Sequence, residues 1–377
     1  MAIKYRQIAE ELRDSILSEQ KIISYKLPTE KELCNKYRVS RQTIRQALRI
    51  LTEEKLITAR QGSGFFTVPL SEHLNKIKIV LLVSEDNEYI YPAFLSELQA
   101  ALRQQGLSLT IYTTRNNYNK ERAILTELLS QRPAVLLVEG IRDAFPNPNI
   151  DLYETLQLSG TNILFINTNY SQLQHISFVR SDDFEGGYLL GKHFITADFQ
   201  KISCILPDFA ANAKERYCGL LASYRDSVLP MPENDIFWYS YNDLSSLRTR
   251  RNTEFLTNFI RRNLYQQDAV FCYNDEIAYW LIKELSYADI KVPEQISIAS
   301  FDNSYLCSIS TPPITSLSMP AHGFCDAIAD FVEKVIKQLS SYEASSYNKV
   351  IPDASSIYSK TLPWELISRS SVLTFSE

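Results

Sequence analysis

The stretch LPTEKELCNKYRVSRQTIRQALRILTEEKLITARQGSGFFTV, which spans Leu27–Val68, decides the fold of the N-terminal part of the chain. Thr29 followed by Glu32 has the spacing of a capping box, which satisfies the free amide groups at the start of a helix. After a tight turn, Ser40 is a second N-cap, and a helical pattern follows over Arg41–Leu51. Two short segments of strand type around a glycine-rich turn then predict a hairpin. This order of elements is typical of a winged helix-turn-helix.

The second helix of this motif has one apolar and one polar face. Ile44, Ala47, Leu48 and Leu51 recur at spacings of three and four and are predicted to face inward. Arginine can hold guanine with two hydrogen bonds, glutamine can do so with adenine, and the first residues of such a helix reach base edges. The residues predicted to contact DNA bases, backbone or, in the wing, sugar-phosphate are Ser40, Arg41, Gln42, Thr43, Arg45, Gln61 and Gly62. The alternative, a solvated surface helix beside a hairpin, does not explain why all these signals occur in this order.

This region resembles the GntR family of bacterial regulators over residues 1 to about 70. The matching segments are Tyr5-Arg6-Gln7-Ile8-Ala9, Leu27-Pro28-Thr29-Glu30, Val39–Leu48 and Gln61–Phe66. The resemblance implies a homodimer that binds double-stranded operator DNA of pseudo-palindromic sequence. It also suggests DNA contacts from Lys4 and from Glu30, whose carboxylate can accept a hydrogen bond from a cytosine amine.

Charge is distributed unevenly along the 377 residues. The net charge is -5, yet residues 1–75 carry 13 Lys and Arg against 9 Asp and Glu, which leaves 26 basic against 35 acidic residues in the remainder. A basic head on an acidic body fits DNA binding confined to the N-terminal part. The chain also exceeds the size at which one core keeps growing, so more than one domain is expected.

The cysteines and histidines suggest no metal site and no cofactor. The six cysteines lie far apart without a CxxC pair, which favours reduced thiols in the core, and the four histidines lack metal-ligand or catalytic-triad spacing. The first twelve residues are polar, and the longest apolar run, Ile79–Val83, is far too short to cross a bilayer. We therefore expect a cytoplasmic protein that does not bind membranes.

Beyond residue 76, apolar runs alternate with segments of helix length. The predicted strands are Ile77–Val83, Leu107–Tyr112, Ala134–Val138, Asn162–Ile166, Ile202–Leu206, Ile236–Tyr239, Ala269–Cys272 and Ile296–Phe301. The predicted helices between them are Pro92–Gln105, Asn119–Gln131, Tyr153–Ser159, Asp183–Thr196, Ala213–Ser227, Leu247–Leu264 and Asp275–Tyr287. Such alternation predicts right-handed βαβ units in doubly wound parallel sheets. So many strands exceed one compact sheet with short loops, so two lobes are expected.

Polar side chains follow several predicted strands. Ligands of doubly wound sheets bind beyond the carboxyl ends of the strands, and two facing lobes place that site in the cleft between them. Carboxylates, amides and an arginine suit the vicinal hydroxyls of a small polyhydroxylated ligand, with an aromatic ring such as Tyr91, Phe94 or Tyr241 over it. The predicted effector-binding residues are Tyr91, Glu139, Asn167, Arg216, Asn274 and Asp302. For each of them taken singly, a role as a helix cap or in stabilising a loop is the alternative.

The body resembles the effector domain of the LacI/GalR family from about Ile77 to the end of the chain. The matching segments are Ser181–Ile195, Lys214–Gly219, Asn274–Ala278, Val292–Ile298, Ser300–Asn303, Pro313–Ser316 and Leu366–Ser371. This resemblance implies the fold of periplasmic sugar receptors, with Asn167, Arg216, Asn274 and Asp302 as effector ligands. The pairing of the two families resembles repressors of arabinose operons, which implies L-arabinose as the effector.

The sequence thus predicts an α/β protein with a small N-terminal winged helix-turn-helix domain. This domain covers residues 1–69, a linker covers 70–76, and a two-lobed, doubly wound α/β domain of periplasmic-binding-protein type covers 77–377. The predicted function is a sequence-specific DNA-binding repressor of sugar-utilisation genes, released from its operator by a small sugar. An enzyme is disfavoured because the chain lacks a G-x-G-x-x-G after a strand, a Walker A loop and a G-x-S-x-G elbow. A different sugar or sugar-phosphate effector, and a constitutive DNA-binding protein that has lost its ligand, stay open.

Overall fold

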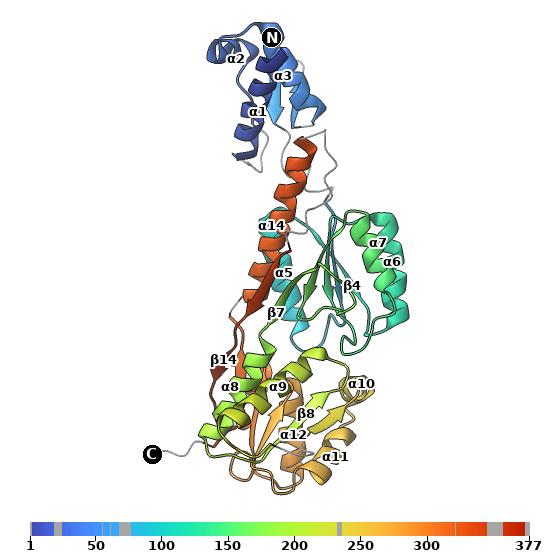
Figure 1. Ribbon diagram of the computed structural model, residues 1–377, viewed down its shortest axis with the longest axis vertical. Coiled ribbons are helices and arrows are strands. Elements are labelled where there is room, and N and C mark those ends of the chain that lie inside the picture. The colour runs from blue at the N-terminus through green and yellow to red at the C-terminus, as the bar shows by residue number, and fades with distance from the viewer. Residues whose placement is uncertain are drawn as a thin grey trace.

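The computed structural model describes residues 2–18, 25–54, 56–60, 62–67, 77–231, 236–320, 322–344 and 357–373. Three bodies follow one another along its long axis: a small head that contains the N-terminus, and two larger lobes (Figure 1). The predicted linker at 70–76 and the predicted wing residue Gln61 lie outside the described residues. None of the described helices is long and apolar enough to cross a membrane.

The head begins with three helices, whose starts follow the sequence signals. They are α1 (Ala2–Ser18), α2 (Glu30–Tyr37) and α3 (Arg41–Glu53). At the start of α2, Thr29 Oγ1 accepts from the amide of Glu32 at 3.3 Å, and the Glu32 carboxylate accepts from the amide of Thr29 at 2.7 Å. The predicted capping box is therefore confirmed. Arg38, in the left-handed conformation with φ 53°, ends α2, and Ser40 caps α3.

The head core forms under α3. Ile44, Ala47, Leu48 and Leu51 are buried against Leu33 of α2 and apolar residues of α1, as their spacing predicts. The antiparallel hairpin of β1 (Ile57–Arg60) and β2 (Gly64–Thr67) completes this domain. Because one side of α3 is used in the core, its other side remains exposed to solvent.

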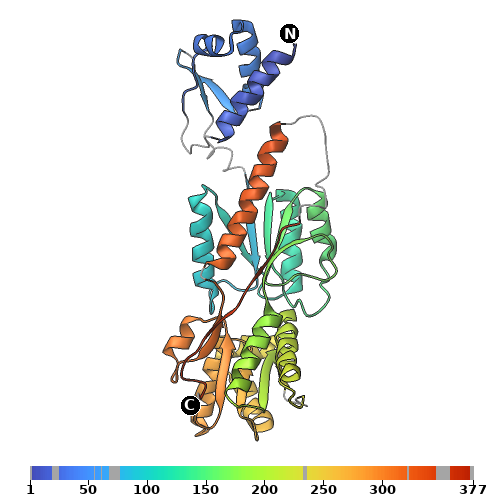
Figure 2. The same ribbon diagram turned by 60° about the vertical axis from the view of Figure 1, so that its left-hand side comes forward.

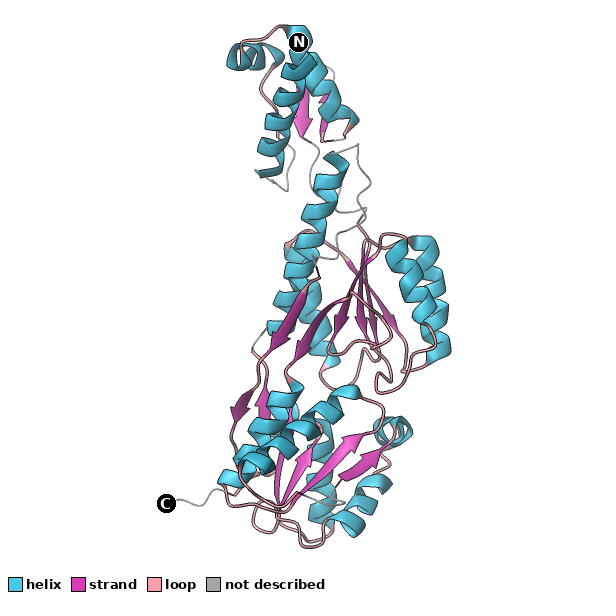
Figure 3. Ribbon diagram, viewed as in Figure 1, coloured by secondary structure: helices cyan, strands magenta, loops and turns pink. Residues whose placement is uncertain are grey.

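The N-terminal lobe is a parallel sheet between two layers of helices (Figures 1 and 3). The strands are β3 (Ile79–Val83), β4 (Leu109–Thr113), β5 (Val135–Glu139), β6 (Asn162–Ile166), β7 (Ser177–Ser181) and β13 (Ser359–Leu362). The helices are α5 (Tyr91–Gln104), α6 (Tyr118–Gln131), α7 (Ile150–Leu158) and α14 (Gly323–Ala344). The strand order is β13-β7-β6-β5-β3-β4. Neighbouring residues of β3 face opposite layers, since Leu81 packs with α5 and α14 and Leu82 with α6 and α7.

The C-terminal lobe has the same layered architecture. Its strands are β8 (Ile202–Pro207), β9 (Ile236–Tyr239), β10 (Ala269–Cys272), β11 (Ser297–Phe301), β12 (Thr315–Ser318) and β14 (Glu365–Ile367). Its helices are α8 (Asp183–Thr196), α9 (Ala211–Asp226), α10 (Tyr241–Arg250), α11 (Glu254–Asn263), α12 (Asp275–Tyr287) and α13 (Tyr305–Ile309). The order is β14-β12-β11-β10-β8-β9, and only β14 is antiparallel to its neighbour. Helices α8 and α9 can lie close together because Gly187 has no side chain; a Cβ there would overlap the backbone oxygen of Arg216.

The chain passes between the two lobes three times. It crosses from β7 to α8, from β12 to α14 and from β13 to β14, and the last of these crossings runs along one side of the molecule (Figure 2). Each lobe is therefore built from segments that are far apart in the sequence. The two-lobed, doubly wound fold predicted from the alternation of strands and helices is confirmed.

Several elements differ from the sequence prediction. Strands β7, β12, β13 and β14 and helices α13 and α14 were not predicted, because none of these strands is a continuous apolar run and both helices lie beyond the last predicted repeat. The prediction of a single helix over Leu247–Leu264 is wrong, since this segment belongs to two separate helices, α10 and α11. Arg251 is left-handed, with φ 55°, and the Asn252 side chain accepts from the amide of Glu254 at 3.0 Å to start α11. A left-handed residue and a local side-chain cap thus divide a segment that has helical spacing throughout.

Candidate functional site

The exposed face of α3 carries the side chains predicted to contact bases. Arg41, Gln42 and Arg45 are all exposed, because the intervening apolar residues face the head core. Arg41 is the first residue of the helix, at the end where backbone amide groups point outward. The face therefore combines cationic and amide donors with the positive end of a helix dipole.

Ser40 and Thr43 form the start of α3. Ser40 Oγ lies 3.3 Å from the amide nitrogen of Thr43 and 2.9 Å from Thr43 Oγ1. Both hydroxyl groups are therefore part of the helix cap, although both are within reach of solvent. Whether these two hydroxyl groups contact the DNA backbone stays a prediction.

Glu30 and Arg45 form an ion pair that sequence reasoning did not identify. Arg45 Nε lies 3.0 Å from Glu30 Oε1 and 3.1 Å from Oε2. The arginine side chain is 68% exposed and the glutamate side chain 27% exposed. Two residues that were predicted separately as DNA contacts thus neutralise each other in the free protein.

The hairpin turn has the backbone that its glycines predict. Gly62 and Gly64 have φ values of 75° and 99°, and a Cβ at Gly62 would meet no atom within 4 Å. Arg60 lies over the ring of Phe66 at 4.5 Å, and Lys4 is exposed on α1. The described part of the wing therefore presents an open glycine beside a cation.

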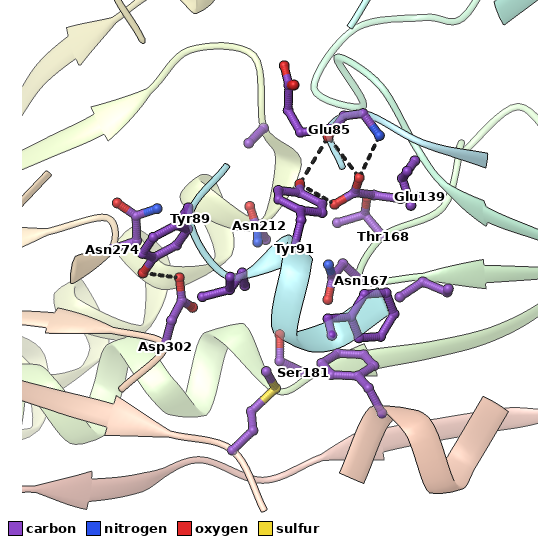
Figure 4. A pocket seen from close by; sticks show the side chains of 18 of the residues that line it. Glu85, Tyr89, Tyr91, Glu139, Asn167, Thr168, Ser181, Asn212, Asn274 and Asp302 are labelled. Atoms are coloured by element: carbon purple, nitrogen blue, oxygen red, sulfur yellow. Dashed lines mark hydrogen bonds between the residues drawn. The ribbon is translucent and has the colours of Figure 1, made fainter. Parts of the chain in front are cut away.

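A cavity of about 420 Å³ lies between the two lobes (Figure 4). All the residues predicted to bind an effector line it: Tyr91, Glu139, Asn167, Arg216, Asn274 and Asp302. They come together because the carboxyl ends of the parallel strands in each lobe face the cleft. Their roles toward a ligand stay predictions, but their common location agrees with the sequence interpretation.

The N-terminal lobe contributes a hydrogen-bonded carboxylate. Glu139, at the end of β5, accepts from Tyr91 Oη at 2.7 Å and from the amide and hydroxyl of Ser84 at 2.8 Å each, as Figure 4 shows. Burial raises the pKa of Glu139, and these donors counteract the shift. Asn167 lies nearby in the left-handed conformation, with φ 70°. This wall offers carboxylate, phenol and amide groups to a ligand.

The C-terminal lobe contributes a second buried carboxylate. Asp302 follows β11, and its carboxylate accepts from Tyr89 Oη of the opposite lobe at 2.9 Å (Figure 4). Burial raises the pKa of Asp302 to about 7. Asn274 caps α12 by accepting from the amide of Ile277 at 3.1 Å, and its side-chain nitrogen, which has no hydrogen bond to the described residues, can donate to a ligand in the cavity. The cap and the cavity roles proposed for Asn274 are therefore compatible.

Arg216 lines the cavity but is largely occupied by protein groups. Its Nε lies 2.7 Å from Asp183 Oδ1, and its Nη1 donates to the backbone oxygen of Tyr273 at 2.5 Å. The guanidinium also lies 4.0 Å from the ring centre of Phe301 and 5.3 Å from that of Trp364. Sequence reasoning identified the arginine and missed the partner, which lies 33 positions earlier in the chain.

Further hydrogen bonds join the lobes at the cavity rim. Tyr241 Oη donates to Glu85 at 3.1 Å, the amide of Ala211 donates to Asp143 at 2.9 Å, and the amide of residue 144 donates to the oxygen of residue 209 at 3.3 Å. Thr168 also donates to Asp143, whose pKa is raised to about 6 by burial. Only Tyr241 was expected here. Glu85 and Asp143 lie in loops without periodic signals, and Ala211 lies just before the helix predicted from Ala213.

Comparisons with known families match the two parts of the chain separately. Residues 4–67 match the family described as bacterial regulatory proteins, gntR family, and residues 192–356 match the periplasmic binding protein-like domain. The head thus matches a gntR-family model, and residues 192–356 of the body match a periplasmic binding protein-like model. This pairing agrees with both resemblances drawn from the sequence.

Two curated relatives resemble this chain over most of its length. The arabinose metabolism transcriptional repressor of Halalkalibacterium halodurans is 28% identical over 326 residues, which cover 85% of this chain and 86% of the relative. The protein of the same name from Geobacillus stearothermophilus is 26% identical over 340 residues, or 89% and 92% of the two chains. Both relatives are regulators named as repressors, and neither is named as an enzyme.

Solved structures support the fold of the body. A LacI-type regulator from Alkaliphilus metalliredigens complexed with D-xylulofuranose superposes with a TM-score of 0.61 at 19% identity, over 79% of this chain and 99% of that one. A complex of the regulator CelR with cellobiose gives a TM-score of 0.61 at 17% identity, over 89% and 92% of the two chains. At this identity the likeness shows the shared fold alone.

Proposed function

We propose that this protein is a transcription repressor of sugar-utilisation genes whose operator affinity is lowered by L-arabinose. The observation that carries the proposal is the joining of an exposed, basic α3 in a gntR-family head to a two-lobed body with a polar cavity between its lobes. Arginine and glutamine on such a helix suit the base edges of the major groove. Two relatives of nearly full length are named as repressors of arabinose metabolism, which supports the choice of sugar.

The cavity has the size and chemistry for a small sugar. Its volume of about 420 Å³ falls within the range of small-molecule sites, roughly 300–1,000 Å³. Glu139 and Asp302 can accept from ring hydroxyls, and Asn167 and Asn274 can both accept and donate. The ring of Tyr91 lies on the same cavity wall. Carboxylates from both lobes would then hold one ligand at once.

A ligand held by both lobes favours the arrangement in which they are close together. Such a ligand shifts the population of lobe orientations, because it gains its full set of contacts only in that state. Two copies of the chain on a pseudo-palindromic operator would transmit this shift as a change in the spacing of their heads. The coupling must be reciprocal, so operator DNA should weaken sugar binding by the same factor.

The test is operator binding at fixed salt, with and without L-arabinose. Fixed salt matters because phosphate contacts make DNA affinity depend strongly on ionic strength. We expect L-arabinose to release the operator, and D-xylose and D-ribose to do so at higher concentration or not at all. Calorimetry with the same sugars gives the affinity of the body directly. Tight operator binding with no heat from any sugar or sugar phosphate would instead identify a constitutive DNA-binding protein.

A further inference from the structure

Three arginines line the cavity, and two of them are paired with buried carboxylates. Arg216 pairs with Asp183 at 2.7 Å, and Arg248 pairs with Glu276 at 2.6 Å. In both pairs the side chains are almost completely buried. Because these charges are neutralised within the protein, neither guanidinium needs a ligand to offset its burial.

The third arginine, Arg142, has no such partner among the described residues. It follows β5 at the cavity, in the left-handed conformation with φ 45°. Its guanidinium carbon lies 5.7 Å from the ring centres of both Tyr118 and Tyr241, which belong to opposite lobes. Its Nε atom is buried and, within the described part of the chain, has no hydrogen-bond partner. The two rings hold the guanidinium in place without using its N–H donors.

A buried donor without an acceptor lowers the stability of the free protein, so an acceptor that arrives with a ligand is strongly favoured. The adjacent carboxylate of Asp143 accepts from Thr168 and from the amide of Ala211, and the described residues show no hydrogen bond or ion pair between it and Arg142. We propose that Arg142 is a specificity-determining residue of the effector site, whose guanidinium donates to hydroxyl oxygens of a neutral sugar. This inference rests on the proposed function and adds Arg142 to the residues that were predicted to bind the effector.

The charges around the cavity favour a neutral ligand over an anionic one. Glu139, Asp143 and Asp302 all line it, and none of them has an ion-pair partner among the described residues. An anionic substituent near Arg142 would share one cavity with these acids. Asp143, with a pKa of about 6, is mostly ionised at neutral pH, and Asp302, with a pKa of about 7, is partly ionised. A sugar hydroxyl avoids that repulsion, since it can accept from Arg142 while donating to a carboxylate.

The experiment compares wild-type protein with Arg142→Met and Arg142→Lys by calorimetry with L-arabinose. A hydrogen bond from a charged donor corresponds to roughly 10–100-fold in affinity, so we expect Arg142→Met to lose about that factor. Arg142→Lys should lie between the two, because it keeps the charge but not the fork of donors. Arg122→Met is the matched control, since Arg122 lies in the same lobe and pairs with Asp151 on the surface. It should bind sugar as the wild type does.

Deoxy analogues of L-arabinose separate a contact from a structural effect. The deficit of Arg142→Met should largely vanish for the analogue that lacks the contacted hydroxyl, and should persist for the others. The thermal midpoint of sugar-free Arg142→Met should not fall below that of the wild type, because the variant removes a buried donor that has no acceptor among the described residues. Equal deficits with every analogue, or wild-type affinity in Arg142→Met, would overturn the assignment while leaving the proposed function intact.

Two outcomes concern the ligand class. A wild-type protein that prefers a pentose phosphate, with that preference lost in Arg142→Met, would overturn the choice of a neutral ligand. A wild-type protein that binds none of these compounds would overturn both the assignment and the proposed function. The wild-type measurement and the variant measurement therefore test the two proposals separately.

Discussion

Two arginines that the sequence assigned to ligands are both ion-paired in the free protein. Arg45 in the head pairs with Glu30 at 3.0 Å, and Arg216 in the body pairs with Asp183 at 2.7 Å. The side chain of Arg45 is 68% exposed, whereas that of Arg216 is 4% exposed. The two pairs have similar geometry and opposite surroundings.

This difference in burial decides what each arginine can do. An exposed ion pair contributes little to stability, so DNA can replace Glu30 as the partner of Arg45 at little cost. Separating a buried pair leaves an uncompensated charge, so Arg216 should keep Asp183 when a ligand enters. Arg216 would then offer only its remaining donors to the effector while holding α8, α9 and the cavity wall together.

The largest effect should come from breaking the buried pair. We expect Asp183→Ala to lower the free energy of unfolding of the body by about 3–5 kcal/mol, because Arg216 is left buried without its partner. All three tryptophans lie in the body, so urea denaturation followed by their fluorescence reports this transition. Glu30→Ala is the matched control in the exposed pair and should leave the transition unchanged. A loss below about 1 kcal/mol for Asp183→Ala would remove the contrast between the pairs.

The acids of the two regions should respond to pH in opposite directions. Burial raises the pKa of Asp302 from 3.8 to about 7, so between these values the folded protein binds a proton that the unfolded chain has released. Stability from this group is therefore complete below about pH 4 and lost as pH rises to 7. In the head, the pKa of Glu32 is lowered by its hydrogen bonds to Thr29, so its contribution is lost on acidification instead.

The check is the urea midpoint of the body at about pH 5 and about pH 7.5. We expect the wild type to lose on the order of 2 kcal/mol over this interval and Asp302→Asn to lose less, since an amide side chain at this position does not titrate. Asp143 and Glu139, whose pKa values are also raised by burial, should keep part of the slope in the variant. Identical slopes in the two proteins would show that Asp302 is ionised throughout.

The head could be read almost entirely from the sequence, because its signals are local. A cap such as Thr29 acts within one turn of its own helix, and the inward face of α3 is set by spacings of three and four. The Glu30–Arg45 pair was missed because it joins two helices 15 positions apart. Contacts across a turn depend on the angle between helices, which periodicity does not encode.

The body could be predicted only as far as its strands were regular. Residues directly after strands, such as Asn167 and Asp302, reached the cavity because parallel strands end at one edge. Tyr89 and Arg142 lie in loops, where no period marks them, so no sequence pattern selects them. Strands such as Ser359–Leu362 have few apolar residues and form because a sheet edge built much earlier in the chain accepts them.

Among the exposed residues of the head, replacing Arg41 should change operator affinity more than replacing Glu30. We expect Arg41→Ala to weaken operator binding by roughly 10–100-fold, because a bidentate contact with guanine contributes about 1–3 kcal/mol. Binding to random DNA should fall much less. Arg49→Ala is the control on the same helix, since Arg49 is exposed farther along α3 and pairs with Glu53 at 2.8 Å. Equal losses on operator and random DNA would show that Arg41 contacts only phosphate.

The smallest effect should come from removing the acid of the exposed pair. Glu30→Gln releases Arg45 from its partner, so we expect less than a tenfold gain in affinity for random DNA. The plot of log affinity against log salt should steepen by about one unit, because one more cation is free to displace a counterion. Glu53→Gln is the matched control, since it releases Arg49 at the far end of the same helix.

The same variant separates the two roles that Glu30 can have. If Glu30 accepts from a cytosine amine, Glu30→Gln loses affinity only for operators that carry this cytosine, and the salt dependence stays unchanged. If Glu30 only holds Arg45, the change appears on every DNA sequence and disappears in the double variant Glu30→Gln, Arg45→Ala. Anisotropy titrations at three salt concentrations, on the operator and on one substituted at each cytosine, distinguish these outcomes. If Glu30→Gln weakened binding to random DNA, the view that Glu30 restrains Arg45 would be wrong.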